Sequence, residues 1–190
     1  MNLEKAKLIN GYILDPELEW LASTARKSTA ILELGAFLGK STRVLCDNTK
    51  GTVCSIDLWE QTEGGLIATF PEVYKEFIDN LRDHLIAQKL SFYKATTDYA
   101  ISLLKNEGRK FDFIFIDADH RYDAVWADLN HWWPKVKNGG ICAGHDYWED
   151  SIAKNLDIEF QGVDNAVQDF FVRDLKLSVE TSDISWIVYK

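Results

Sequence analysis

The sequence predicts an α/β protein built on a mostly parallel sheet of seven strands with helices on both faces. Short apolar runs alternate with longer amphipathic stretches along the chain, which is the pattern of a parallel sheet whose strands are connected by helices. The last two apolar runs follow each other without a helical stretch between them, so we expect them to form an antiparallel pair. The chain has 190 residues, of which 46% are hydrophobic, enough to bury one substantial core. We therefore expect a Rossmann-like sheet in a single domain spanning residues 1–190.

Seven runs carry the strand prediction. The first follows a polar turn, the fourth (FDFIFID) is the strongest, and the fifth is opened by the sequence Asn138-Gly139-Gly140. The expected strands are residues 30–34, 52–57, 90–94, 111–117, 140–143, 176–179 and 185–189. Apolar side chains recur every three or four residues over 73–86 and 122–133, which predicts two helices that pack on the sheet. Ligands of such sheets bind at the carboxyl ends of the strands, so the residues just after each strand are candidate site residues.

Composition disfavours several classes of partner. The formal net charge is 21 − 30 = −9, whereas nucleic acids and anionic membranes attract basic surfaces. Three cysteines, Cys46, Cys54 and Cys142, are widely spaced and odd in number, which is typical of reduced, buried thiols. No run approaches the ~20 apolar residues of a membrane span, and the first residues lack the apolar core of a signal peptide. We expect a cytoplasmic protein with no nucleic-acid or membrane partner.

The stretch ILELGAFLGKST, residues 31–42, contains the turn that follows the first strand. It ends in Gly-Lys-Ser-Thr, as a triphosphate loop does, but that loop needs four residues between its first glycine and Gly-Lys. Here Gly35 and Gly39 enclose only three residues. A dinucleotide turn, GxGxxG, would have a glycine where Phe37 stands, and the Phe37 side chain would obstruct a pyrophosphate. Both phosphate interpretations fit poorly, and a P-loop-like phosphotransferase using Lys40 is kept as an alternative.

The pattern Glu33-x-Gly35-x-x-x-Gly39 after a strand resembles the first motif of class I S-adenosylmethionine-dependent methyltransferases. This cofactor has no phosphate, so the turn need not bind such an anion, and Gly35 would let the backbone approach the methionine part closely. Ser41, near a helix start, could contact the carboxylate of the cofactor. The second strand ends in Asp57, 22 residues after Gly35, where an acidic residue can accept both ribose hydroxyls.

Acidic and histidine side chains follow the fourth and fifth strands. Asp117, Asp119 and His120 come after the fourth strand, and His145 and Asp146 come after the fifth. If these strands are neighbours, about 4.8 Å apart, three carboxylates and two imidazoles converge at one edge of the sheet. Like charges gathered there are costly unless a cation compensates them. Oxygen ligands favour Mg²⁺, Mn²⁺ or Ca²⁺, and an added imidazole favours Mn²⁺ or another transition metal. The alternative is a capping aspartate and an exposed histidine without a metal.

Together, the sequences ILELGAFLGKST, FDFIFIDADHRYD and NGGICAGHDYW resemble the metal-dependent O-methyltransferases related to the catechol and caffeoyl-CoA enzymes. They resemble more closely methyltransferase family 24, which includes macrocin O-methyltransferase-like proteins, and the resemblance extends over residues 11–190. It implies metal ligands at Asp117, His145 and Asp146, and catalytic roles for His120, where the catechol-type relatives have lysine, and for Asp117. The implied cofactor contacts are Glu33, Gly35, Ala36, Phe37, Gly39, Ser41, Asp57, Leu58, Thr96, Asp117 and Asp119.

The resemblance therefore implies an S-adenosylmethionine-dependent O-methyltransferase, assisted by Mg²⁺ or Mn²⁺, that methylates a hydroxyl of a sugar, polyol or catechol-like small molecule. The cation would lower the pKa of the attacking hydroxyl, and His120 would remove its proton. We expect residues 58–70 to form a loop over the site with a hinge at Gly64-Gly65, and Trp59 and Trp148 to be candidates for lining a pocket. Relatives often form dimers, so the resemblance also implies a homodimer. The alternatives are an S-adenosylmethionine-binding protein without methyl transfer and an enzyme that cleaves the cofactor.

Overall fold

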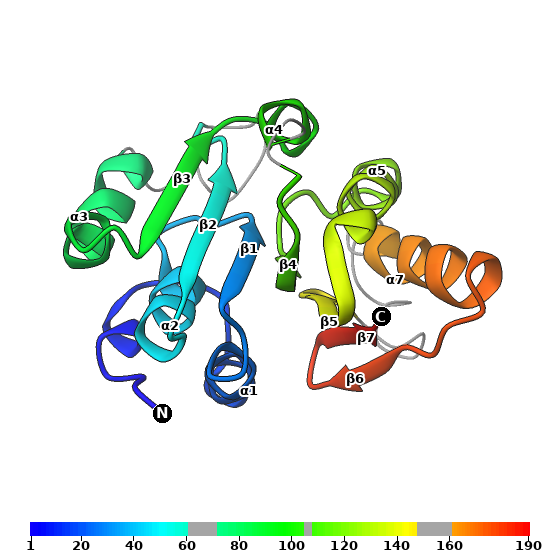
Figure 1. The fold of residues 1–190 in the computed structure, drawn as a ribbon, viewed down its shortest axis with the longest axis horizontal. Helices are drawn as coiled ribbons and strands as arrows, with labels where there is room; N and C mark the ends of the chain where they lie inside the picture. The colour runs from blue at the N-terminus through cyan, green and yellow to red at the C-terminus, as the bar shows by residue number, and fades with distance from the viewer. Residues whose placement is uncertain (61–71, 105–107, 148–160) are drawn as a thin grey trace. The chain divides into compact units, whose positions relative to one another are not determined.

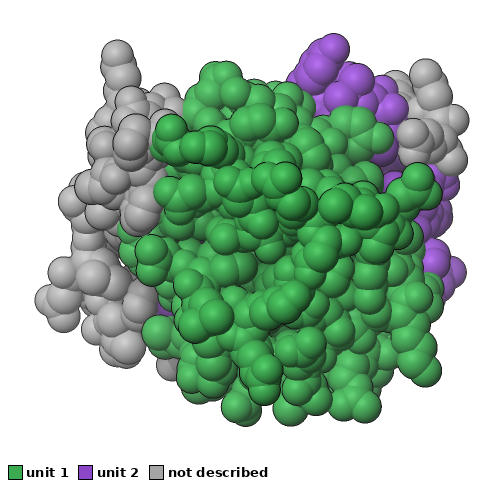
Figure 2. Space-filling model, turned by 90° about the vertical axis from the view of Figure 1, so that its left-hand side faces the viewer, with its two compact units in different colours: residues 1–96 green, residues 97–190 purple. Residues whose placement is uncertain are grey.

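The computed structural model describes residues 1–60, 72–104, 108–147 and 161–190. Its strands form a seven-stranded sheet in the order β3-β2-β1-β4-β5-β7-β6. This confirms the predicted fold class, a Rossmann-like, mostly parallel sheet with an antiparallel pair at the C-terminal end. The chain divides into two compact units, residues 1–96 (unit 1) and residues 97–190 (unit 2), coloured green and purple in Figure 2. A single domain over residues 1–190 stays a prediction.

Unit 1 contains three parallel strands, whose arrows point the same way in Figure 1. They are β1 (Ala30–Leu34), β2 (Thr52–Asp57) and β3 (Leu90–Lys94), with β2 between the other two. The bounds of all three strands agree with the sequence prediction. The helical elements among its described residues are η1 (Ala6–Leu8), α1 (Asp15–Ala25), α2 (Lys40–Asn48) and α3 (Val73–Ile86). The predicted helix over 73–86 is therefore confirmed.

The first helix, α1, was not predicted from the sequence, although its signals are local. The backbone N–H of Leu14 donates to the Glu17 carboxylate at 3.1 Å, and a proline occupies the first turn. Both features favour a helix start. Its buried apolar residues are Leu18, Leu21, Ala22 and Ala25. They recur at i, i+3, i+4 and i+7, so one face of the helix packs into the core.

Unit 2 contains the other four strands. The pair β4 (Phe111–Ile116) and β5 (Val136–Gly144) is parallel, whereas β7 (Ser185–Tyr189) is antiparallel to β5 and to β6 (Glu180–Ser182). The helical elements in the described part of unit 2 are α4 (Thr97–Leu104), α5 (Tyr122–Trp132), the 3₁₀ turn η4 (Trp133–Lys135), α7 (Gln161–Val167) and the π-helical segment η6 (Gln168–Asp174). The predicted helix over 122–133 is confirmed and ends one residue earlier, because Trp133 enters the 3₁₀ turn that contains a proline.

The predicted strand over residues 176–179 is wrong. The strand that pairs with β7 is β6, and it begins at Glu180. Lys176 has a left-handed backbone (φ 57°), and the N–H of Leu177 donates to the carbonyl of Phe171 at 2.8 Å, so this segment is bonded to the preceding helix. The hairpin turn contains Asp183 at φ 53°, and such short turns fix the pairing register of the strands beside them.

The interior is built from the apolar faces that the sequence patterns indicated. Phe77 and Leu81 of α3 are buried, as are Leu129 and Trp132 of α5. The three cysteines are buried and free of disulfides, as predicted. Burial raises the pKa of the Cys46 and Cys142 thiols, so both are unreactive at neutral pH. Among the described residues, the helices are too short or too polar to cross a membrane.

Candidate functional site

In unit 1, the turn after β1 is shaped by backbone hydrogen bonds and left-handed residues. The N–H of Gly35 donates to the carbonyl of Ile56 in β2 at 2.8 Å, and the N–H of Gly39 donates to the carbonyl of Ala36 at 2.7 Å. Gly35, Phe37 and Gly39 have φ of 82°, 46° and 89°. A Cβ on Gly39 would also overlap the Leu81 side chain of α3. Gly39 is therefore required both for its backbone conformation and for the close packing of α3.

The carboxylate of Asp57 holds this turn from the end of β2. Its Oδ2 accepts hydrogen bonds from the N–H groups of Ala36 at 2.7 Å and Phe37 at 2.8 Å, and its Oδ1 accepts from the N–H of Trp59 at 2.7 Å. Two carboxylate oxygens can accept about four hydrogen bonds, so acceptor capacity is left for ribose hydroxyls. The structure thus brings together three of the predicted cofactor residues. Their contact with a cofactor stays a prediction.

Glu33 lies in the core below the turn. Its side chain is fully buried, and Oε2 accepts hydrogen bonds from the hydroxyls of Thr42 at 2.5 Å and Ser55 at 2.6 Å. These bonds join β1 to α2 and β2. Glu33 therefore supports the turn from within the protein, and its predicted direct contact with a cofactor is not tested by this arrangement.

The other predicted cofactor residues of unit 1 lie at the ends of the strands. Ser41 is buried in the first turn of α2, whereas Leu58 and Thr96 are exposed after β2 and β3. The N–H of Ala95, beside Thr96, donates to the carbonyl of Asp57 at 3.0 Å, which keeps the ends of these two strands together. All of these residues lie at the carboxyl edge of the strands, where ligands of such sheets bind.

The tryptophan predicted to line a pocket in this unit has a packing role. Trp59 is buried, its ring centroid lies 4.5 Å from that of Phe77 and 5.6 Å from that of Phe92, and its Nε1 donates to the carbonyl of Phe37 at 2.8 Å. Trp59 therefore stabilises the turn. Most of the predicted loop over residues 58–70, including Gly64-Gly65, and Trp148 lie outside the described residues.

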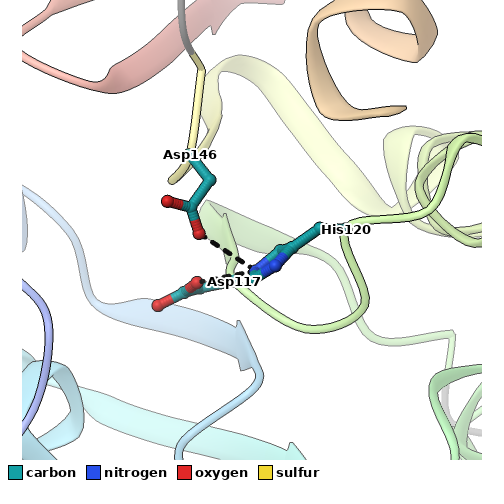
Figure 3. Close-up of side chains that lie close together, drawn as sticks. All are labelled: Asp117, His120 and Asp146. Atoms are coloured by element: carbon teal, nitrogen blue, oxygen red, sulfur yellow. Dashed lines mark ion pairs between the residues drawn. The ribbon is translucent and has the colours of Figure 1, made fainter. Parts of the chain in front are cut away.

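In unit 2, the predicted acidic and histidine cluster forms where β4 and β5 end. Ile116 and Gly144 are partners in the parallel pair, and the N–H of His145 donates to the carbonyl of Ile116 at 3.1 Å. This register places Asp117 beside His145 and Asp146. Figure 3 shows the side chains of Asp117, His120 and Asp146 directed toward one another.

The distances within this cluster identify a set of three donors. One ligand atom from each of Asp117, His120 and Asp146 lies within 4.8 Å of the others. Nε2 of His120 is 3.0 Å from Oδ2 of Asp146 and 3.8 Å from Oδ1 of Asp117. His145 is buried, and its Nδ1 is 3.2 Å from Oδ2 of Asp146 and 3.7 Å from Oδ1 of Asp117. Four of the predicted residues are thus adjacent: Asp117, His120, His145 and Asp146. The imidazole of His120 lies about as close to the two carboxylates as that of His145 does.

Asp119 lies apart from this group. Its carboxylate binds the guanidinium of Arg121, with Oδ2 2.6 Å from Nη2, and its Oδ1 accepts the N–H of Arg121 at 2.9 Å. Burial raises the pKa of Asp119, but the hydrogen bonds from Arg121 outweigh that effect and the pKa is lowered. The predicted contact of Asp119 with the cofactor is untested.

The charge balance of the cluster favours a positive group. Burial lowers the pKa of His120, but the hydrogen bond to Asp117 and the charge of Asp146 raise it, and the net direction is upward. A proton on His120 would compensate the charge of the two carboxylates. A divalent cation would supply the same compensation, and two carboxylates with one or two imidazoles are a donor set suited to Mn²⁺ and similar ions.

One residue that supports this cluster was not predicted as part of the site. Gly162 lies in the first turn of α7, and a Cβ there would overlap the carbonyl oxygen of His120 and lie 2.5 Å from the N–H nitrogen of Tyr122. Glycine at this position lets α7 pack directly on the loop that carries His120. The sequence signal, a lone glycine at the start of a helical pattern, indicates such a close approach only when the neighbouring loop is known.

Comparisons with known proteins agree with this fold. A family model described as a methyltransferase domain, Methyltransf_24, matches residues 32–147, and the chain therefore belongs to that family. This confirms the predicted resemblance to methyltransferase family 24. The prediction that the protein is an enzyme of the methyltransferase class is also confirmed. No protein of curated function matches the sequence.

Solved structures share the fold at low sequence identity. An O-methyltransferase from Bacillus cereus in complex with S-adenosylhomocysteine is 19% identical, with a TM-score of 0.71, covering 97% of this chain and 86% of that one. A methyltransferase from Podospora anserina bound to S-adenosylhomocysteine is 16% identical, with a TM-score of 0.69, covering 98% of this chain and 85% of that one. This similarity establishes the fold over nearly the whole chain.

Proposed function

We propose that the protein transfers a methyl group from S-adenosylmethionine to a hydroxyl group of a small molecule, with the help of a divalent cation. Membership of the methyltransferase family and the turn held by Asp57 support the cofactor assignment. The observation that carries the cation-assisted part is the convergence of Asp117, His120 and Asp146 within 4.8 Å. A sugar, polyol or catechol-like substrate is the expected acceptor, because carboxylate-bound cations favour oxygen ligands.

The residues of unit 1 would bind and orient the cofactor. The turn from Gly35 to Gly39 offers close backbone approach, and Asp57 has acceptor capacity for the ribose hydroxyls. Because Asp57 and Trp59 already hold the turn in shape, little conformational ordering is needed on binding. S-adenosylmethionine itself supplies the reactive methyl group on its sulfonium, so the protein contributes position and electrostatics.

The residues of unit 2 would bind the cation and move the proton. A bound divalent cation would lower the pKa of a coordinated substrate hydroxyl and fix its direction. Two assignments are consistent with the distances. In the first, Asp117, His145 and Asp146 bind the ion and His120 accepts the hydroxyl proton. In the second, His120 completes the ligand set and His145, through its contact with Asp146, orients that carboxylate.

Metal binding by single variants separates these two assignments. Binding of Mn²⁺ to the purified protein is measured by electron paramagnetic resonance for His120→Gln and His145→Gln. The first assignment expects His120→Gln to keep its Mn²⁺ affinity and lose methyl transfer. The second expects His120→Gln to lose Mn²⁺. Unchanged Mn²⁺ binding in Asp117→Ala and Asp146→Ala would contradict both assignments. The proposal would then be a methyltransferase that does not use a metal ion at this cluster.

The alternatives are separated by ligand binding and product analysis. A phosphotransferase would bind ATP through Lys40, whereas the turn is one residue shorter than a triphosphate loop, and Lys40 Nζ donates to the carbonyl of Gly11 at 3.3 Å. Calorimetry with S-adenosylmethionine, S-adenosylhomocysteine and ATP distinguishes these cofactors. Mass spectrometry of a panel of hydroxylated acceptors detects a methylated product. Tight cofactor binding without product would favour a binding protein, and breakdown of the cofactor alone would favour a cleaving enzyme.

The remaining expectations concern the surroundings of the enzyme. A homodimer and a cytoplasmic location stay predictions, as does the absence of a nucleic-acid or membrane partner. Light scattering coupled to size-exclusion chromatography measures the oligomeric state directly. Fractionation of cells tests the location.

A further inference from the structure

Lys40, the lysine of the Gly-Lys-Ser-Thr sequence, contacts a segment that lies far from it in the chain. Its Nζ donates to the carbonyl oxygen of Gly11 at 3.3 Å. Its aliphatic stem lies against Gly11 as well, because a Cβ on that glycine would be 3.2 Å from Cδ and 3.3 Å from Cβ of Lys40. The contact places the N-terminal segment against the first residue of α2. The contact also explains the presence of Lys40, for which a phosphate-binding role fits poorly.

The next residue of this segment contacts the same turn at its other end. The ring centroids of Tyr12 and Phe37 are 6.0 Å apart with an angle of 28° between the planes, which is a stacked arrangement. Two consecutive residues, Gly11 and Tyr12, therefore contact Lys40 and Phe37 on either side of Gly39. The segment from Gly11 to Tyr12 crosses the turn.

The segment is anchored firmly on one side and weakly over the turn. Ile13 is buried, and the N–H of Leu14 is held by Glu17 at the start of α1. In contrast, Tyr12 is 60% exposed, and the hydrogen bond from Lys40 is long. Because a long hydrogen bond and the contact of an exposed ring hold it over the turn, the segment can leave the turn without unfolding α1.

We propose that residues Gly11 and Tyr12 form one wall of the cofactor site, and that Lys40 is the positioning residue that holds them there. This inference rests on the proposed cofactor site at the turn. The segment contacts Lys40 and Phe37, and Asp57 holds Ala36 and Phe37 of the same turn, so a cofactor that binds this turn would lie beside the segment. Binding of the cofactor and closure of the segment are then linked, because each reduces the freedom of the other.

Calorimetry with S-adenosylhomocysteine tests the link on the whole protein. Lys40→Met keeps the aliphatic stem and removes the ammonium group, and we expect its Kd for S-adenosylhomocysteine to rise about 3- to 10-fold, the equivalent of one such hydrogen bond. Tyr12→Ala should raise the Kd by a similar factor through loss of the ring contact. Lys40→Arg, which can still donate to Gly11, should restore most of the affinity. Lys50→Met is the matched control, because Lys50 is exposed and precedes β2 at the opposite end of the strands.

Hydrogen exchange distinguishes this positioning role from a purely structural one, because only the positioning role predicts that ligand binding changes the exchange rate of the segment. Addition of S-adenosylhomocysteine should slow exchange at residues 11–13 in the wild type, and much less in Lys40→Met. Wild-type affinity in both Lys40→Met and Tyr12→Ala, with no change of exchange at 11–13 on binding, would overturn the inference and leave the proposed function intact. A wild-type protein that binds no S-adenosyl compound would overturn both together.

Discussion

The carboxylate of Asp57 accepts a hydrogen bond from the backbone N–H of Ala36 at 2.7 Å, which ties the end of β2 to the turn after β1. The same oxygen accepts from Phe37, and the other oxygen accepts from Trp59. An acidic residue predicted to bind ribose thus also shapes the surface on which the cofactor would lie. The structural role of Asp57 and its proposed role in binding would therefore be coupled, and we expect substitutions at this position to affect both.

Replacement of Asp57 by alanine should lower the free energy of unfolding and the cofactor affinity together. Three N–H groups lose a charged acceptor, and hydrogen bonds to charged groups contribute about 1.5–3 kcal/mol each, reduced where water replaces the lost partner. We expect a loss of about 2 kcal/mol in urea denaturation and a weaker calorimetric affinity for S-adenosylhomocysteine. Asp57→Asn keeps one acceptor oxygen and should recover part of the stability. A Kd unchanged in Asp57→Ala would argue against ribose binding by this residue.

Replacement of Gly39 by alanine should disrupt the packing between the turn and α3. The new Cβ overlaps Leu81, and φ of 89° strains any residue with a side chain. We expect a loss of about 2–4 kcal/mol in the free energy of unfolding, the sum of backbone strain and overpacking. Gly139→Ala is the matched control, because φ there is 76° and a Cβ would meet no atom within 4 Å. Equal losses in the two variants would show that backbone strain alone acts at Gly39.

The buried carboxyl group of Asp128 should make the stability depend on pH. Burial raises the pKa of Asp128 on α5 to about 7 from its ordinary value of 3.8, more than the hydrogen bond from Thr97 lowers it. The folded state therefore holds the proton more tightly than the unfolded state. The resulting stability is fully present below pH 3.8 and is lost as the pH rises to about 7. By linkage this amounts to up to about 4 kcal/mol.

Asp128→Asn removes this titration and should flatten the pH dependence of the free energy of unfolding between pH 5 and 8, as measured by urea denaturation at each pH. The variant should be more stable than the wild type at the upper end of this range, because no charge is buried there. Asp123→Asn, an exposed position on the same helix, is the control and should follow the wild type. A wild-type profile that matches Asp128→Asn would show that the carboxyl group titrates normally.

Replacement of Gly162 by alanine should displace the loop that carries His120. The added Cβ overlaps the carbonyl of His120, and backbone atoms cannot yield as a flexible side chain can. We expect Mn²⁺ affinity and methyl-transfer rate to fall roughly 10-fold or more, as when a supporting residue of a metal site is lost. Ala166→Gly, on the same helix, is a control for helix propensity. Wild-type Mn²⁺ binding in Gly162→Ala would show that the packing of α7 does not position the cluster.

Local patterns predicted much of the fold. The bounds of β1, β2, β3 and β7 follow from short apolar runs between polar turns, and α3 follows from its apolar periodicity. The strand before β7 could not be placed correctly, because its register depends on the backbone of Asp183 and not on hydrophobicity. The candidate site shows the same division. Asp57, Asp117 and Asp146 were found because they end strands, whereas the contact of Lys40 with Gly11 and the closeness of Gly162 to His120 join segments that no local pattern connects.

The buried carboxylate of Glu33 has a consequence for how this protein can change over generations. Two hydroxyl groups, of Thr42 and Ser55, depend on it in the interior, so an apolar side chain at position 33 alone would leave both without that acceptor. Loss of one such buried partner costs about 1–3 kcal/mol, whereas replacement of all partners by apolar groups of similar shape can be nearly neutral. The residues at positions 33, 42 and 55 are therefore expected to change together. A protein in which only one of the three has been replaced would be less stable than one with either complete set.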